Sequence, residues 1–429
     1  MTSRSAPLWI ALFLALAAAL WWWHQPAAPV PVPAPPPPVA PAPSPLSDLA
    51  VVPDWASLNR YQSTITRGDF LRLMDTVFTV SPAWREWIEV GEEEANIRTT
   101  GSTADGDSLR LRFAPDGLAS TPPRYWRSAT ELPPAPPARP LEGLRIAIDP
   151  GHIGGRWGKM EERWFQIPGS QPVQEGDMTL QVAKLLKPRL EALGATVTLV
   201  REETEPVTPV RPDMLEEQAR ASSSGGDIVR LAERLFYRTA EIRARARVVN
   251  DTIRPDLVLC LHFNADAWGD PAAPSLVPTN HFHMLLNGGY MDNELAKADE
   301  RYDLLTKLLQ GVHDEERKLA ASTAAAFVER NPMPPYLYNP AARNHRNVDG
   351  NPYLWARNLL ANRTYHCPVV YYEPYVMNST EDHARIQAGD YEGEREVWGK
   401  PRPSIFREYA DSAARGLENY YRHSRKMAE

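Results

Sequence analysis

Two histidines in this sequence each follow a run of mostly apolar residues. His152 closes the motif Asp-Pro-Gly-His after the run 144–148, and His262 follows the run 257–261. Runs of this kind predict buried strands, so both rings are expected at strand ends that face a cleft. Glu175 stands just before a helical pattern and supplies a carboxylate. Two imidazoles and one carboxylate leave a fourth position for water, so the sequence predicts a zinc hydrolase with these three side chains as ligands.

A second carboxylate is expected at the same edge of the sheet. Glu373 ends the apolar run 368–373, and burying an unpaired charge after such a strand is costly, which favours a functional role. The predicted role is that of a general base, which takes a proton from the attacking water and returns it to the departing amine. The sequence has no Gly-x-Ser-x-Gly motif that would supply a serine nucleophile instead.

The elements that must hold these residues alternate along the chain. From residue 143 on, the predicted elements are strands at 145–149, 196–200, 257–262, 282–286 and 368–373, and helices at 177–193, 227–250, 318–329 and 404–425. This alternation is typical of an α/β fold with a mostly parallel twisted sheet flanked by helices. Such sheets bind ligands at the carboxyl ends of their strands, where His152, His262 and Glu373 are expected.

Two proline-rich segments divide the chain before this region. We expect linkers at 26–45 and 131–142, a small α+β accessory domain between them at 46–130, and a catalytic domain at 143–425. Within the accessory domain the pattern predicts a helix at 66–78 and strands at 84–90 and 109–113.

The first 25 residues predict export from the cytoplasm. Arg4 precedes an almost uncharged run, 8–23, that ends in three tryptophans. A short apolar run after a basic residue is typical of a signal peptide, whereas interfacial tryptophans favour an uncleaved signal anchor. Both alternatives give a periplasmic or cell-envelope protein, and the anchor would hold it at the inner membrane.

Charge and cysteine content exclude some classes. The formal net charge is −7 and the pI is near 5.9, so no nucleic-acid partner is expected, because phosphate binding needs a basic face. Two cysteines, Cys260 and Cys367, are too few for a disulfide framework. We expect buried free thiols, and a single disulfide stays open if their strands are neighbours.

Five segments in this order resemble those of the zinc-dependent N-acetylmuramoyl-L-alanine amidases of the amidase-3 type: Ile148–Gly155, Glu175 ahead of a helix, Arg243 with Asn250 on a helix, Leu261–Ala265, and Glu373 with Asn378. The resemblance covers residues 144–422. It implies that His152, Glu175 and His262 bind zinc and that Glu373 is the catalytic carboxylate. It also implies that peptidoglycan is the substrate, cleaved at the amide between N-acetylmuramic acid and the L-alanine of the stem peptide.

The chain departs from that family by added length. The segment between His152 and Glu175 is long, and it makes Glu161 and Glu162 alternatives for the ligand carboxylate. Further added segments are expected at the rim of the cleft: 202–226, 288–317 and 331–360. Either of the last two could cover the zinc site at rest, with 288–317 as the segment to shorten in a test.

Other polar residues have weaker assignments. His281 and His283 flank Phe282 on a strand, so they are expected on one side, at the surface or the substrate rim. Asn264 and Asn378 are candidates to orient the site. Three arginines are expected at the surface, with binding of wall-peptide carboxylates as the alternative: Arg201, Arg211 and Arg343.

Two other functions stay open. The same zinc set would suit a peptidase that cleaves within the stem peptide, and a wall-binding relative without activity would keep the fold. The new N-terminal residue released from peptidoglycan distinguishes these alternatives.

Overall fold

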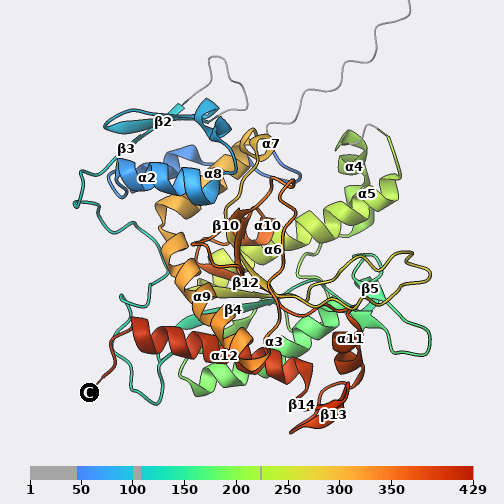
Figure 1. The fold of residues 1–429 in the computed structure, drawn as a ribbon. Helices are drawn as coiled ribbons and strands as arrows, with labels where there is room; N and C mark the ends of the chain where they lie inside the picture. The colour runs from blue at the N-terminus through green and yellow to red at the C-terminus, as the bar shows by residue number, and fades with distance from the viewer. Residues whose placement is uncertain (1–45, 100–107, 223–224, 429) are drawn as a thin grey trace, which may run out of the picture. The chain divides into compact units, whose positions relative to one another are not determined.

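A seven-stranded sheet forms the centre of the computed structural model, which describes residues 46–99, 108–222 and 225–428 (Figure 1). Across this described sheet the order is β10 (Arg346–Asn347), β11 (Leu354–Arg357), β9 (His283–Asn287), β12 (Val369–Glu373), β8 (Leu257–Leu261), β4 (Arg145–Pro150) and β7 (Thr196–Leu199). The expected α/β fold with a mostly parallel sheet flanked by helices is confirmed. The strand 354–357 was not expected, since its four residues, Leu-Trp-Ala-Arg, carry no clear alternation.

The directions of the strands determine which strand ends lie at each edge of the sheet. Strands β7, β4, β8 and β12 are parallel, with Leu259 opposite both Ile148 and Val370. Their carboxyl ends therefore share one edge, as the sequence predicts. Strand β9 runs antiparallel to β12, with Glu373 opposite His283, and β11 is parallel to β9. The chain that leaves β9 consequently starts from the opposite edge of the sheet.

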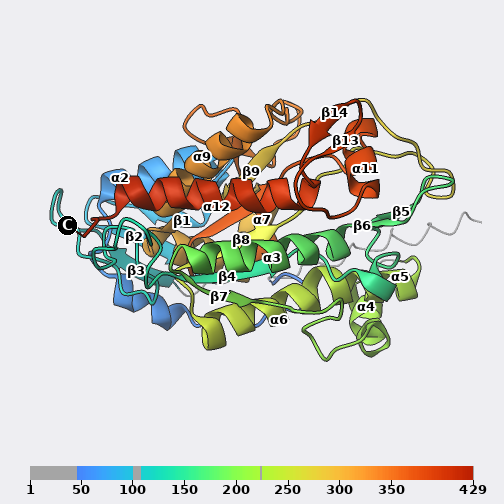
Figure 2. The same cartoon turned by 90° about the horizontal axis from the view of Figure 1, so that it is seen from below.

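Alternate residues of the central strands pack into layers on opposite faces. On one face Ile146, Ile148 and Leu259 join a cluster with helices α3 (Glu175–Ala192), α9 (Val312–Arg330) and α12 (Ile405–Ser424). On the other face a second cluster joins Ala147, Val258 and Cys260 to α6 (Glu241–Arg247) and α10 (Leu360–Thr364). Figure 2 shows α3 and α12 separated from α6 by the strands. These layers fix the sheet edge that carries the histidines.

The helix expected at 227–250 is built from several helical segments. Asp227 caps α5 (Ile228–Leu235) by accepting hydrogen bonds from the backbone N–H groups of Val229 and Arg230. A π-helical turn, Phe236–Ala240, connects α5 to α6, and another, Val248–Ile253, leads toward β8. The predicted helix at 404–425 is confirmed as α12.

The region 46–130 contains the expected helix, α2 (Arg67–Leu73), capped by Thr66, and a three-stranded sheet. The expected strand 84–90 is only half right: Pro82–Glu86 forms a 3-10 turn, because Ser81 caps it and Pro82 favours its first turn, and β1 is limited to Ile88–Val90. Strands β2 (Glu94–Arg98) and β3 (Ser108–Arg112) complete the sheet.

This region packs onto the rest of the chain. The backbone of Tyr290 donates to the carbonyl of Phe78 at 2.8 Å, and Val80 donates back to Tyr290 at 3.1 Å. The residues Ser44–Glu429 form one compact unit. The division into an accessory domain at 46–130 and a catalytic domain at 143–425 stays a prediction. The predicted signal segment, 1–25, and the linker 26–45 lie outside the described residues.

Two further findings concern the described residues. Cys260 and Cys367 are buried free thiols, as expected. In the ranges that the structure covers, no helix combines the length and apolar character needed to cross a membrane.

Buried histidines make the stability depend on pH. Burial lowers the pKa of His313 and of His366 to about 4, and that of His283 to about 3. Between pH 6.5 and about 4 the unfolded chain binds protons that the folded chain does not. The contribution of each histidine is therefore fully present above pH 6.5 and is lost as the pH falls through this window.

The variant His313→Gln is expected to lose less stability on acidification than the parent protein. Removing this titration should reduce the decrease in unfolding free energy between pH 7 and pH 5 by about 2 kcal/mol. Denaturant unfolding at both pH values measures the difference. The exposed His423→Gln serves as control, and an equal pH response of both variants would show that His313 does not contribute.

Candidate metal centre and active site

The structure brings together the three candidate ligands His152, Glu175 and His262. Nε2 of His152 lies 3.2 Å from Oε2 of Glu175, and Nδ1 of His262 lies 2.9 Å from Oε1 of the same carboxylate. One potential ligand atom from each residue falls within 4.8 Å of the others. Tetrahedral zinc with bonds of about 2.0–2.2 Å separates its ligand atoms by roughly 3.3–3.6 Å. The donor types and their spacing therefore fit a zinc ion.

A tight turn after β4 creates this approach. His152 has a φ of 58°, in the left-handed region, and directly follows Gly151. A Cβ atom on Gly151 would lie 2.3 Å from Cε1 of His262, so only glycine lets the two strand ends come so close. The expectation that a turn presents His152 to a cleft is thus met by the geometry.

Glu175 begins α3 rather than preceding it. The residue is 2 % exposed, and its carboxylate accepts a hydrogen bond from the backbone of Phe263 at 3.2 Å. Burial opposes ionisation, but His152 and His262 hold the pKa of Glu175 well below its ordinary value. Burial likewise lowers the pKa of His152, yet the Glu175 and Glu161 carboxylates raise it to about 9. The centre therefore favours positive charge, as a cation site requires.

The alternatives Glu161 and Glu162 have different positions. The Glu161 carboxylate accepts from the backbones of Ile153, at 2.9 Å, and Gly154, at 3.0 Å, and lies 3.6 Å from Nδ1 of His152. It therefore supports His152 from behind, in the way that carboxylates orient metal-binding histidines. Glu162 turns away from the ligands and pairs with arginines on the α5 side: Arg230, Arg234 and Arg238.

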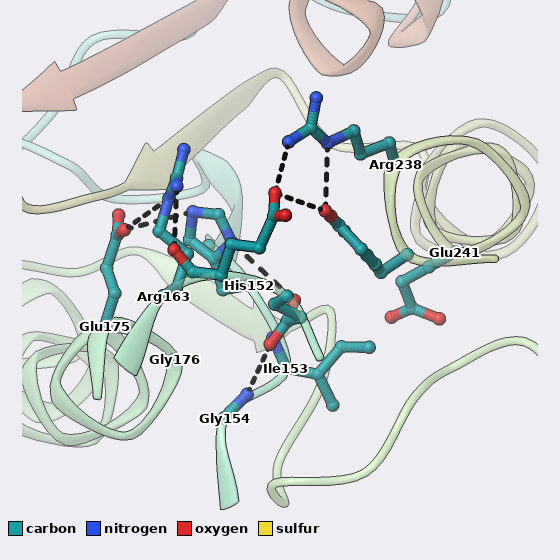
Figure 3. A network of polar contacts seen from close by, with 12 residues as sticks. His152, Ile153, Gly154, Arg163, Glu175, Gly176, Arg238 and Glu241 are labelled. Carbon is teal, nitrogen blue, oxygen red and sulfur yellow. Dashed lines mark hydrogen bonds and ion pairs between the residues drawn. The ribbon is translucent and has the colours of Figure 1, made fainter. Parts of the chain in front are cut away.

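Arg163 follows these two residues and turns back toward the centre. Its Nε lies 3.3 Å from Oε2 of Glu175, and Figure 3 shows its guanidinium beside that carboxylate. The segment 161–163 thus contacts His152 and Glu175 through its first and third residues.

Glu161→Gln is expected to weaken metal binding about 10- to 100-fold, because His152 loses the charged acceptor that fixes its ring. Glu162→Gln is the matched comparison and should leave the metal affinity close to that of the parent. Competition with a chelator of known affinity measures both. A larger loss for Glu162→Gln than for Glu161→Gln would reverse the two assignments.

Glu373 ends β12 at the same edge and lines the cavity beside the ligands. Within the described ranges no group forms a hydrogen bond or ion pair with its carboxylate. Burial and the nearby Glu175 charge raise the pKa of Glu373 to about 8, and a bound cation would lower that pKa again. Two residues earlier, Tyr371 stacks on His262 with ring centroids 4.3 Å apart.

Two buried arginines hold the His152 turn. Arg245 donates to Asp149 at 2.9 Å, to the His152 carbonyl at 2.8 Å and to Glu241 at 2.8 Å. Arg201 donates to the carbonyls of Pro150, at 3.1 Å, and Gly176, at 2.7 Å. The expected surface position of Arg201 is therefore wrong: the residue is 4 % exposed, because its donors join β4 to α3.

The other two arginines of that group lie elsewhere. Arg343 is exposed, as expected, and Arg211 is partly buried and donates to the carbonyls of Thr208 and Val210. Arg243, singled out in the helix motif, binds Ser47 and Asp299 instead of the centre.

His281 and His283 lie on one side of the chain, as predicted, since both approach Nδ2 of Asn264, at 3.4 and 3.3 Å. Both are buried, so the surface alternative is wrong, whereas His283 lines the same cavity as Glu373, which agrees with the substrate-rim alternative. Asn264 therefore contacts these histidines rather than the three candidate ligands. Asn378 accepts from the backbone of Asp266 at 3.0 Å and so fixes the loop that follows His262.

A cavity of about 890 Å³ contains the candidate ligands and Glu373. Of the three added segments, 331–360 reaches it, through Tyr336, Tyr338 and Arg357, whereas no described residue of 202–226 or 288–317 lines it. The predicted rim position of 288–317, and the gate there, are therefore wrong. Segment 202–226 lies beside the cavity, since the backbones of Val207 and Thr208 donate to Glu241, one of the lining residues. Segment 288–317 leaves β9, whose antiparallel direction takes the chain to the opposite edge.

Sequence reasoning missed several residues around the site. Arg245 carries a signal that could have found it: Glu241 stands four residues earlier, and alanines flank the arginine on a helix that must bury one face. Tyr338 and Arg357 belong to a segment without periodicity, so no pattern indicated them.

Comparisons with known proteins bear on the family of this chain. A family model described as N-acetylmuramoyl-L-alanine amidase matches residues 146–395, which include the three candidate ligands and Glu373. A comparison with the curated proteins finds no match.

Solved structures similar to this chain include three amidases. The apo form of the N-acetylmuramyl-L-alanine amidase Ami1 from Mycobacterium abscessus is 14% identical, with a TM-score of 0.37, and the match covers 65% of this chain and 99% of that one. AmiC2 of Nostoc punctiforme is 15% identical, with a TM-score of 0.36 and 66% and 99% coverage. The catalytic domain of CwlV from Bacillus (Paenibacillus) polymyxa is 12% identical, with a TM-score of 0.35 and 65% and 97% coverage.

The family match alone spans more than half of the chain. This chain belongs to the N-acetylmuramoyl-L-alanine amidase family.

Proposed function

We propose that the protein is a zinc-dependent amidase that hydrolyses the amide between N-acetylmuramic acid and the L-alanine of the peptidoglycan stem peptide. The observation that carries this proposal is the unpaired Glu373 carboxylate, which lines the same cavity as a His/Glu/His set with zinc-like spacing. Family membership supports the choice of substrate bond.

His152, Glu175 and His262 would hold the zinc ion. When bound, zinc activates water near neutral pH and polarises the scissile carbonyl. Glu373 accepts the proton of the attacking water and passes it to the amine of L-alanine as the bond breaks. Because no group within the described ranges pairs with its carboxylate, Glu373 is free to carry that proton. Glu161 keeps Nε2 of His152 directed toward the centre.

Digestion of purified peptidoglycan tests the proposal. The expected product is a stem peptide with a new N-terminal L-alanine, identified by labelling the free amine and by mass spectrometry. Another new N-terminal residue would make the protein a zinc peptidase. Retention on peptidoglycan without any new amine would make it a wall-binding relative without activity.

We further propose that the protein works in the periplasm, held at the inner membrane by its first 25 residues. The support is the sequence alone, Arg4 and the apolar run 8–23 followed by a proline-rich linker. Fractionation should recover the full-length chain with the inner membrane. A shortened periplasmic form would indicate a cleaved signal peptide, and a full-length cytosolic form would contradict export.

A further inference from the structure

The cavity continues past the candidate metal ligands along one face of the sheet. Arg357 on β11 pairs with Asn287 on β9. His283, four residues before Asn287 on β9, pairs with Glu373 on β12. With strands about 4.8 Å apart and a rise of about 3.3 Å per residue, the Cα atoms of Arg357 and Glu373 are roughly 16 Å apart. The arginine side chain covers part of this distance. The remainder accommodates about two or three residues of extended peptide.

The walls of this extension suit a peptide. Side chains of the sheet form its floor and residues around α6 and α10 form the opposite wall: Leu285, Tyr371, Ile242, Leu359, Leu360 and Ala361. Tyr336 and Tyr338 border it as well. An apolar cavity with a few polar groups is the usual form of a binding site for an organic ligand.

Arg357 differs from the other arginines of the cavity in its charge balance. Three of these arginines pair with carboxylates of the chain: Arg163 with Glu175 at 3.3 Å, Arg238 with Glu162 at 3.1 Å, and Arg245 with Asp149 at 2.9 Å. Arg357 has no ion-pair partner in the part of the chain that the structure describes. A partly buried cation without a counter-ion favours an anionic ligand.

The surroundings of Arg357 place its charge in the cavity. Its guanidinium carbon lies 5.7 Å from the ring centroid of Tyr338, whose hydroxyl is 3.2 Å from Nε2 of His283. Burial keeps His283 uncharged at neutral pH, with a pKa of about 3. The positive charge of this wall is therefore that of Arg357. Tyr338 packs against both His345 and Trp355, which also contact each other, and so supports the arginine with a rigid aromatic surface.

We propose that Arg357, supported by Tyr338, binds a free carboxylate of the stem peptide, on the amine side of the scissile bond. The proposal rests on the amidase function proposed above. The lactyl carboxyl group of N-acetylmuramic acid is consumed in the amide, so the sugar side has no carboxylate to offer there. The stem peptide keeps free carboxylates, and a guanidinium binds a carboxylate through two parallel hydrogen bonds.

The test compares two muropeptides, one with free stem-peptide carboxylates and one with these carboxylates amidated. The parent protein should cleave the free form with kcat/KM about 10- to 100-fold higher, the effect expected of one charged hydrogen-bonded pair. Arg357→Gln should lose this preference, because its kcat/KM should fall only for the muropeptide with free carboxylates. Arg357→Lys should keep part of the preference. Arg415→Gln, outside the cavity, is the control and should behave as the parent does.

The outcomes separate two roles of Arg357. An equal loss on both muropeptides, with a shifted pH profile, would mean that the arginine acts on Glu373 and would overturn the proposal. Equal cleavage of both forms by the parent would overturn it too. Calorimetric binding to the inactive Glu373→Gln protein measures the same preference without turnover. If the parent protein releases no stem peptide with a new N-terminal L-alanine, the amidase function is refuted, whereas the binding data still decide the role of Arg357.

Discussion

Replacement of Glu373 by glutamine is expected to lower kcat about 10²- to 10⁴-fold while zinc stays bound. Glutamine has nearly the same shape but cannot accept the proton of the attacking water. Glu373 is not among the three ligand residues, so the metal should be retained. Turnover on peptidoglycan and elemental analysis of the same sample measure both quantities.

The variant His262→Ala removes a candidate ligand, so it should lose the metal together with the activity. Its metal content should therefore differ from that of Glu373→Gln, which should keep the metal. Glu392→Gln, at an exposed position, controls for the loss of a negative charge. Near-normal turnover of Glu373→Gln would exclude Glu373 as the general base. An active parent protein without stoichiometric metal would exclude the zinc mechanism as a whole.

Arg245→Met is expected to lower the free energy of unfolding by about 3–5 kcal/mol, the usual cost of removing one partner of a buried ion pair. Asp149 and Glu241 are both buried and would lose their guanidinium partner. Asp149 would keep the hydroxyl of Tyr365, and Glu241 would keep two backbone donors. These remaining hydrogen bonds do not neutralise the two charges.

Denaturant unfolding of Arg245→Met beside Arg247→Met checks this prediction. Arg247 lies on the same helix, is exposed, and its replacement should change stability by less than about 0.5 kcal/mol. The Arg245 variant should also bind zinc more weakly, because the His152 carbonyl loses its donor. Equal stability of the two variants would show that the buried charges are compensated elsewhere.

The residues at strand ends could be predicted from the sequence because strand periodicity and the parallel arrangement are local and general rules. To place His152, His262 and Glu373 at one edge of the sheet, it was enough to know that their strands run in the same direction. The direction of β9 follows no such pattern: the same apolar run could run either way. The error about segment 288–317 came from that single unknown.

Residues that act through long-range contacts could not be assigned from the sequence. Arg201 reaches carbonyls about 25 and 50 residues away along the chain, so its composition-based assignment to the surface had no information about them. Glu161 and Glu162 are chemically identical neighbours, and their different partners depend on a backbone turn with a φ of 58° at Glu162. Side-chain direction in an irregular loop is decided by the fold and not by residue type.

The segment 161–163 makes the metal centre sensitive to the length of the loop between His152 and Glu175. Its first residue supports His152, its second is held by arginines of the α5 side, and its third reaches Glu175. A deletion of one residue just before this segment would exchange inward and outward positions, directing Glu162 toward His152 and Arg163 toward the arginines. Arg163 and the arginines of the α5 side would then be neighbours of like charge. Single-residue insertions and deletions between His152 and Glu175 are therefore far less tolerable than substitutions at exposed positions of the same loop, despite its irregular structure.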